Sequence, residues 1–159
     1  MKAMLIQTNL NGANLEHAEL NNANLNSALL KKVTMLGINL MGSTLIHADL
    51  READIKISIL ADTNLQHTKL NNATIDASDL TLAEIDEADL TNAHLFLTKM
   101  KGANLSRANL NQAQLKYANL EKANLTQAIL IETDLHKANL SGAHFQQANL
   151  AKTNLHAAD

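Results

Sequence analysis

The sequence predicts an all-β solenoid, in which a short extended segment and a bend repeat so that the chain winds around an apolar axis. Every residue whose number is divisible by five, from Leu5 to Leu155, is Leu, Ile, Met or Phe, and 25 of these 31 residues are Leu. Two residues earlier stands Ala, Ser or Thr at every position except Val33 and Ile38. Because a repeat this regular dominates local propensities, it determines the expected architecture.

A five-residue period excludes a continuous helix and a continuous strand. In an α-helix, five residues advance by about 140° beyond a full turn, which would scatter the large side chains around the cylinder. In a β-strand, an odd spacing would send successive large residues to opposite faces. The pattern instead favours a short extended piece whose small and large residues point inward on either side of an outward polar residue. The next two, variable residues then form a bend, where all five glycines lie.

The repeated motif A-N-L-x-x or A-D-L-x-x, as in Ala13-Asn14-Leu15 and Ala108-Asn109-Leu110, resembles the pentapeptide-repeat family over essentially the whole chain. The resemblance implies a right-handed quadrilateral β-helix with four pentapeptides per coil and about eight coils, forming a single uninterrupted solenoid over residues 1–159. Exposed residues twenty positions apart would then be neighbours, about 4.8 Å apart. The Asn residues of the motif are predicted to bond nearby backbone groups rather than ligands.

Composition fits a soluble protein: 46% of residues are apolar, only 2% are aromatic, and Cys and Pro are absent. Without Cys there is no disulfide framework. The longest charge-free stretch, residues 33–46, is shorter than the roughly 20 apolar residues that cross a bilayer. Because the N-terminal segment enters the repeat at once, no signal peptide is predicted. A cytoplasmic location is therefore expected.

Catalytic motifs are not found in the sequence. It has no Gly-rich phosphate loop, nucleophile elbow, Cys nucleophile or zinc-ligand pattern, and a regular rod offers no obvious concave pocket. We therefore expect a noncatalytic protein without a cofactor. In the twenty-residue register, His47, His67, Glu87 and Arg107 share one external column. Two imidazoles and a carboxylate are metal ligands, but ligands on a straight ladder do not converge, so no metal site is predicted.

Apolar residues at outward positions form a stripe along one side of the expected rod. Ile57, Ala77, Leu97 and Tyr117 share one column, and Leu36 and Phe96 lie in the adjacent column. A contiguous exposed apolar patch often marks an interface, although bend residues also cover the edge of a core. We predict a scaffold that docks an unknown protein partner through the residues that we call the docking stripe: Leu36, Ile57, Phe96, Leu97 and Tyr117. Three lysines would give the stripe a basic rim: Lys56, Lys116 and Lys137.

Acidic residues form a second candidate surface. All charged residues between Lys69 and Lys99 are acidic and would circle the rod as a belt: Asp76, Asp79, Glu84, Asp86, Glu87 and Asp89. The ordinary interpretation is a solvated girdle that keeps the rod soluble. Some pentapeptide-repeat proteins that protect type II topoisomerases from quinolones are thought to imitate duplex DNA. The resemblance therefore implies an alternative function, a DNA mimic that inhibits or protects DNA gyrase or topoisomerase IV.

The charge balance weighs against that alternative. Duplex DNA carries one negative charge per roughly 1.7 Å, whereas this chain has 16 acidic against 13 basic residues and a net charge of −3. Direct nucleic-acid binding is not expected either, because no basic patch with interleaved aromatic residues is present.

The repeat persists from Ala3 to Ala158, and unpaired backbone at the end of a solenoid is a template for another chain. End-to-end association, or a small homo-oligomer, is therefore a further hypothesis.

Overall fold

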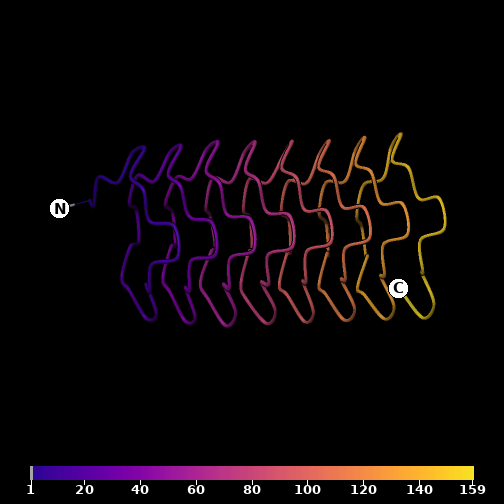
Figure 1. Ribbon diagram of the computed structural model, residues 1–159. Coiled ribbons are helices and arrows are strands. Elements are labelled where there is room, and N and C mark those ends of the chain that lie inside the picture. The colour runs from indigo at the N-terminus through magenta and orange to yellow at the C-terminus, as the bar shows by residue number, and fades with distance from the viewer. Residues whose placement is uncertain (1) are drawn as a thin grey trace.

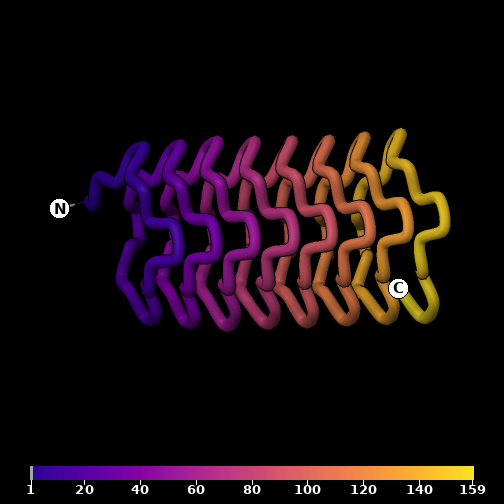
Figure 2. Tube along the Cα trace, viewed as in Figure 1, coloured from indigo at the N-terminus to yellow at the C-terminus, as the bar shows by residue number. Residues whose placement is uncertain are grey.

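The structure is a computed structural model that describes residues 2–159, and within this range backbone pairing consists of single-residue bridges rather than extended strands. Each residue that precedes a large residue forms a parallel bridge with the residue twenty positions later, from Met4 with Asn24 to Asp134 with Asn154. Five residues per side and twenty per coil make a four-sided β-helix. Figures 1 and 2 show the coils stacked into a straight rod. The predicted all-β solenoid is confirmed.

Backbone hydrogen bonds join successive coils and also close the corners, as the side around Leu15 illustrates. The Leu15 amide donates to the Thr34 carbonyl of the next coil at 2.7 Å, and the Thr34 amide donates back to the Ala13 carbonyl at 3.0 Å. Around the corner, the Ala18 amide donates to the Leu15 carbonyl at 3.1 Å. Each coil is therefore paired as a parallel sheet is, and the corners are closed as β-turns. The corner of Ile57 is different, because there the Ser58 amide donates to Ser78 Oγ and that hydroxyl donates to the Ile55 carbonyl.

Every corner has a residue in the left-handed backbone region. The second variable residue has φ between 55° and 67° at all corners from Gln7 to Ala157. Glycine occupies only five of these corners, and 26 are occupied by other residue types. The prediction that glycines serve the bend is correct, but the bend does not require them, because the hydrogen bonds of the stacked coils impose the same φ on every residue type.

The core consists of the small and large residues of the repeat. From Ala23 to Ala138 these side chains are almost completely buried, including the bulkier Val33 and Ile38. Ser and Thr at small positions are accommodated by bonds to the backbone, as when Thr63 Oγ1 donates to the Leu60 carbonyl at 2.6 Å. Ser43 is an exception, because its buried hydroxyl has no hydrogen-bond partner among residues 2–159.

The asparagines of the motif have the predicted structural role. Asn14 Oδ1 accepts the Glu16 amide at 2.8 Å, and Asn104 Oδ1 accepts the Ser106 amide at 3.2 Å. Such bonds fix the entry to each corner.

Among residues 2–159, no helix could span a membrane.

Candidate functional site

Four of the five residues of the docking stripe are exposed. The exposed fractions are 67% for Ile57, 49% for Leu97, 43% for Tyr117 and 41% for Phe96. Leu36 is only partly exposed. In the twenty-residue register, two polar residues also separate Leu36 from Phe96 within their shared column, so Leu36 lies at the margin of the stripe.

Aromatic rings continue the stripe toward the C-terminal coil. The rings of Phe96 and Tyr117 meet edge-on with centroids 5.6 Å apart, and Tyr117 meets His136 edge-on at 6.0 Å. His136 then stacks on His156, with centroids 5.1 Å apart. The predicted rim residue Lys137 places its Nζ 5.5 Å from the centre of the Tyr117 ring. Sequence reasoning missed both histidines, although their twenty-residue spacing was a usable signal.

The other two predicted rim lysines are engaged in ion pairs. Lys56 Nζ lies 3.0 Å from Asp54 Oδ2, and Lys116 Nζ lies 3.1 Å from Asp134 Oδ2. Both lysine side chains are partly exposed, at 42% and 44%. Since exposed ion pairs contribute little to stability, these lysines remain available to a partner's carboxylates.

Exposed apolar residues that the sequence analysis missed extend the surface around a corner. Ile59 is 41% exposed and is separated from Ile57 only by the buried Ser58. Its signal was an apolar residue at a position where the motif has Asn or Asp. Leu82 is 56% exposed and has φ of 57°, but in the register it lies at a different corner from Leu97.

The acidic belt follows part of one coil, from Asp76 to Asp89, and its carboxylates are already bonded within the rod. Glu87 pairs with His67 Nδ1 at 3.1 Å and with Arg107 at 2.7 Å. Asp86 is only 7% exposed and accepts from Gln66 Nε2 at 2.8 Å. The belt is therefore not a row of free negative charges.

The remaining belt carboxylates also accept hydrogen bonds from the rod. Asp76 accepts the Phe96 amide at 2.8 Å, Glu84 accepts Asn104 Nδ2 at 2.8 Å, and Asp79 accepts the Thr81 amide at 3.0 Å. For Asp89, burial acts most strongly and raises the pKa, but hydrogen bonds from Thr91 and Asn71 oppose it, so the net pKa lies below its ordinary value. These contacts connect adjacent coils and adjacent positions of the corner.

The column of His47, His67 and Glu87 is a ladder of contacts between successive coils. The two imidazole rings stack with centroids 4.8 Å apart, and His67 then contacts Glu87. Within residues 2–159, no three His, Cys, Asp or Glu side chains gather in a geometry that would hold a metal ion. The same part of the chain encloses no pocket.

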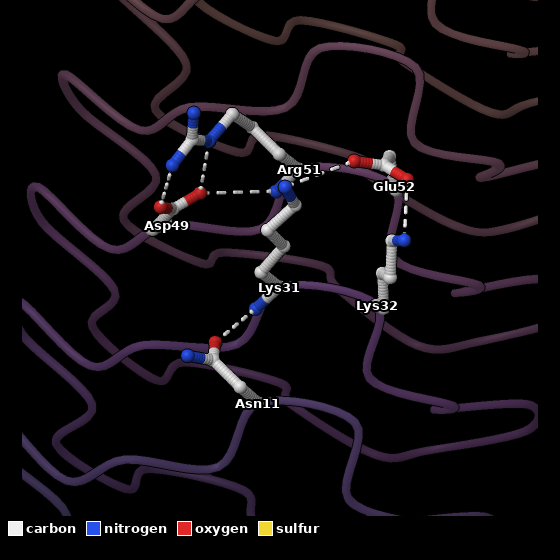
Figure 3. Close-up of polar contacts among 6 residues, drawn as sticks. All are labelled: Asn11, Lys31, Lys32, Asp49, Arg51 and Glu52. Atoms are coloured by element: carbon white, nitrogen blue, oxygen red, sulfur yellow. Dashed lines mark hydrogen bonds and ion pairs between the residues drawn. The ribbon is translucent and has the colours of Figure 1, made fainter.

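Basic residues nearer the N-terminus form a paired network rather than a free patch (Figure 3). Lys31 and Lys32 both contact Glu52, at 3.2 and 3.4 Å, and the Arg51 guanidinium donates to Asp49 Oδ1 at 2.7 Å. The hydrogen bond from Arg51 is the main reason that the pKa of Asp49 lies below its ordinary value. This network spans adjacent coils and leaves no concentrated positive charge.

The sequence and the fold of this chain are both similar to those of pentapeptide-repeat proteins. The sequence pattern described as pentapeptide repeats matches residues 2–35, 24–56, 58–95, 98–127 and 128–159. No curated protein sequence matches the chain. The structure is similar to that of HetL, a pentapeptide repeat protein involved in heterocyst differentiation regulation from the cyanobacterium Nostoc. The identity is 30% and the TM-score is 0.66, and the match covers 98% of this chain and 80% of HetL.

A second solved structure is similar in fold alone. It is a trypsin-treated form of QnrB1, a plasmid-mediated fluoroquinolone resistance protein. Its identity with this chain is 16% and the TM-score is 0.57, with coverage of 92% of this chain and 78% of QnrB1. At this identity the likeness concerns the β-helix and not the surface residues.

Proposed function

This chain belongs to the pentapeptide-repeat family, and we propose that it is a noncatalytic scaffold whose docking stripe binds a protein partner. Membership of this family and the rod-shaped fold both support a regular repeat scaffold. Function then depends on what the outward columns present. On this chain the exposed apolar side chains of Ile57, Leu97, Tyr117 and Phe96 follow one another along one side.

The observation that carries the proposal is the conformation of Ile57. It is the only β-branched residue among the corner residues with positive φ, at 56°, and its side chain is 67% exposed. A β-branched residue is strongly disfavoured in this backbone region, where an L-residue costs about 1–2 kcal/mol. Because the side chain is largely outside the core, packing does not offset that strain. Binding of an apolar group by a partner is a reason for Ile57 to occupy this corner.

The surroundings of the stripe suggest the chemistry of the partner. An apolar centre with partly exposed Lys56 and Lys116 beside it, and Lys137 over the Tyr117 ring, matches an apolar anchor flanked by carboxylates. Aromatic side chains at the centre of an interface are frequent hot spots. We therefore expect Phe96, Leu97 and Tyr117 to contribute most of the binding free energy.

The test is partner capture with two matched variants. Leu97→Glu places a carboxylate in the stripe, and Leu82→Glu places one at another corner with the same φ of 57° and a similarly exposed side chain. We expect wild type and Leu82→Glu to enrich the same protein from host lysate, and Leu97→Glu to lose it while retaining the thermal unfolding midpoint of Leu82→Glu. A partner retained by Leu97→Glu would place the binding surface elsewhere.

The alternative, inhibition or protection of DNA gyrase or topoisomerase IV by the acidic belt, has weaker support because the belt carboxylates are bonded to their own rod. A supercoiling assay with and without a fluoroquinolone distinguishes the two functions. The docking proposal expects no effect of this protein at large excess over gyrase. Inhibition or drug protection that disappears when Asp76, Glu84, Asp86 and Asp89 are all neutralised would instead establish the alternative.

A further inference from the structure

We propose that His136 and His156 form a binding site for a divalent transition metal ion, and that Cu²⁺ binds there more tightly than other ions of this class. The two residues occupy equivalent positions of successive coils, so the backbone pairing fixes their separation. Their rings stack with centroids 5.1 Å apart and planes inclined by 20°, and the two Nδ1 atoms lie 3.2 Å apart. Imidazole nitrogen is a preferred ligand of Cu²⁺, Ni²⁺ and Zn²⁺, and affinity is usually greatest for Cu²⁺.

The spacing of the two nitrogen atoms suits a shared ion. At a metal–nitrogen distance of about 2.0–2.1 Å, two ligands are about 3.3 Å apart in tetrahedral geometry and about 2.9 Å apart in square-planar geometry. The observed 3.2 Å lies between these values. Because the rings are nearly parallel, one ring must rotate to direct both lone pairs at the same point. His136 is partly exposed and His156 is exposed, so this rotation displaces no core residue.

The proton balance of the site follows from the same contact. Two neutral imidazoles at this distance share one hydrogen bond, with Nδ1–H on one ring and a lone pair on the other. When the ion binds, that ring loses its Nδ1 proton to water and gains one on Nε2, so both Nδ1 atoms become ligands. Water molecules complete the coordination. Nearby, Asp134 accepts the His136 amide at 3.1 Å and is neutralised by Lys116 at 3.1 Å.

The other stacked pair of histidines provides an internal comparison. His47 and His67 also stack, with centroids 4.8 Å apart and planes inclined by 17°. However, His67 Nδ1 is bonded to Glu87 at 3.1 Å, and Glu87 is also held by Arg107 at 2.7 Å. An ion that took His67 Nδ1 as a ligand would have to displace Glu87 from it. Among residues 2–159, the Nδ1 atoms of His136 and His156 have only their mutual contact to exchange for the ion.

Tyr117 gives a direct readout of the site. It is the only Tyr in a chain without Trp, and its ring centroid lies 6.0 Å from that of His136. Bound Cu²⁺ quenches nearby aromatic fluorescence, so titration with copper sulfate should quench Tyr117 emission and saturate at one equivalent. His136→Gln and His156→Gln should each weaken this binding about tenfold or more, while the matched control His67→Gln should leave it unchanged.

A second measurement tests whether the ion joins the two coils. A ligand that binds only the folded protein stabilises it, so Cu²⁺ should raise the unfolding midpoint of wild type and of His67→Gln by more than that of His156→Gln. Circular dichroism of each metal-free variant checks that the fold is retained. Quenching that persists unchanged in His136→Gln and His156→Gln, equal loss in His67→Gln, or no quenching at stoichiometric Cu²⁺ would each overturn the proposal.

Discussion

The ring of Phe96 meets the ring of Tyr117 edge-on across the boundary between two successive coils, with planes inclined by 83°. Pairs of this geometry contribute about 0.5–1.5 kcal/mol beyond their burial. Because both rings are partly exposed, we expect the lower half of that range. In a double-mutant cycle, Phe96→Ala and Tyr117→Ala should show a coupling free energy of about 0.5–1 kcal/mol in urea unfolding. The distant pair Phe96→Ala and Ile129→Ala should be additive, and additivity in the first pair would contradict the prediction.

Ile57→Gly should stabilise the rod while weakening partner binding. Glycine removes the strain of a β-branched residue at φ of 56°, partly offset by the greater entropy of the unfolded chain, for a net gain of roughly 0.5–1 kcal/mol. At another corner, Gly12→Ala should destabilise through strain alone, because no atom of residues 2–159 beyond the two chain neighbours of Gly12 lies within 4 Å of the added Cβ. Thermal unfolding measures both changes. A lower midpoint for Ile57→Gly would mean that the exposed Ile57 side chain stabilises the fold.

Two buried serines should respond to replacement with opposite signs. Ser43 Oγ has no hydrogen-bond partner in the described part of the chain, so Ser43→Ala should be neutral or stabilise by up to about 1 kcal/mol. Ser78 Oγ accepts the Ser58 amide at 3.0 Å and donates to the Ile55 carbonyl at 2.8 Å. Ser78→Ala removes both of these hydrogen bonds from the corner and should cost about 1–3 kcal/mol. Chemical denaturation of the two variants gives the comparison, and similar losses in both would refute it.

Acid should remove the contribution of the ion pair between Asp49 and Arg51. Since the folded pKa of Asp49 is lowered, its contribution is fully present above the ordinary value of 3.8 and is lost as pH falls through the lower folded value. Arg51→Gln should therefore be less stable than wild type at neutral pH, and the difference should shrink below pH 3.8. Urea unfolding across this range tests the sign. A difference that is constant with pH would assign the effect of Arg51 to packing.

The sequence predicted the backbone and core because one periodicity determines both. Once large residues recur every five positions, the repeat predicts which positions point inward. The burial of Leu25 and of Ala73 follows from that geometry. The register also predicted that His67, Glu87 and Arg107 would be neighbours, which is confirmed.

Features that depend on side-chain rotamers or on imposed backbone strain could not be predicted. Nothing in the motif indicates that Ile57 must adopt positive φ, because glycine at other corners suggests that glycine is needed there. The pairing of Asp76 with the Phe96 amide is also invisible in a list of charges. Belt and stripe therefore looked separate in the sequence, although this contact joins them.

Deletions and insertions of five residues would move the outward side chains that follow them to a different side of the rod. Because each side takes five residues and each column recurs after twenty, removal of residues 62–66 would keep every downstream large side chain inside the core. It would nevertheless carry Leu97 and Tyr117 to a different side from Ile57. Removal of residues 62–81 would instead keep all three in line and bring them one coil closer. Insertions and deletions in steps of five can thus rearrange the outer pattern of the rod without repacking its interior.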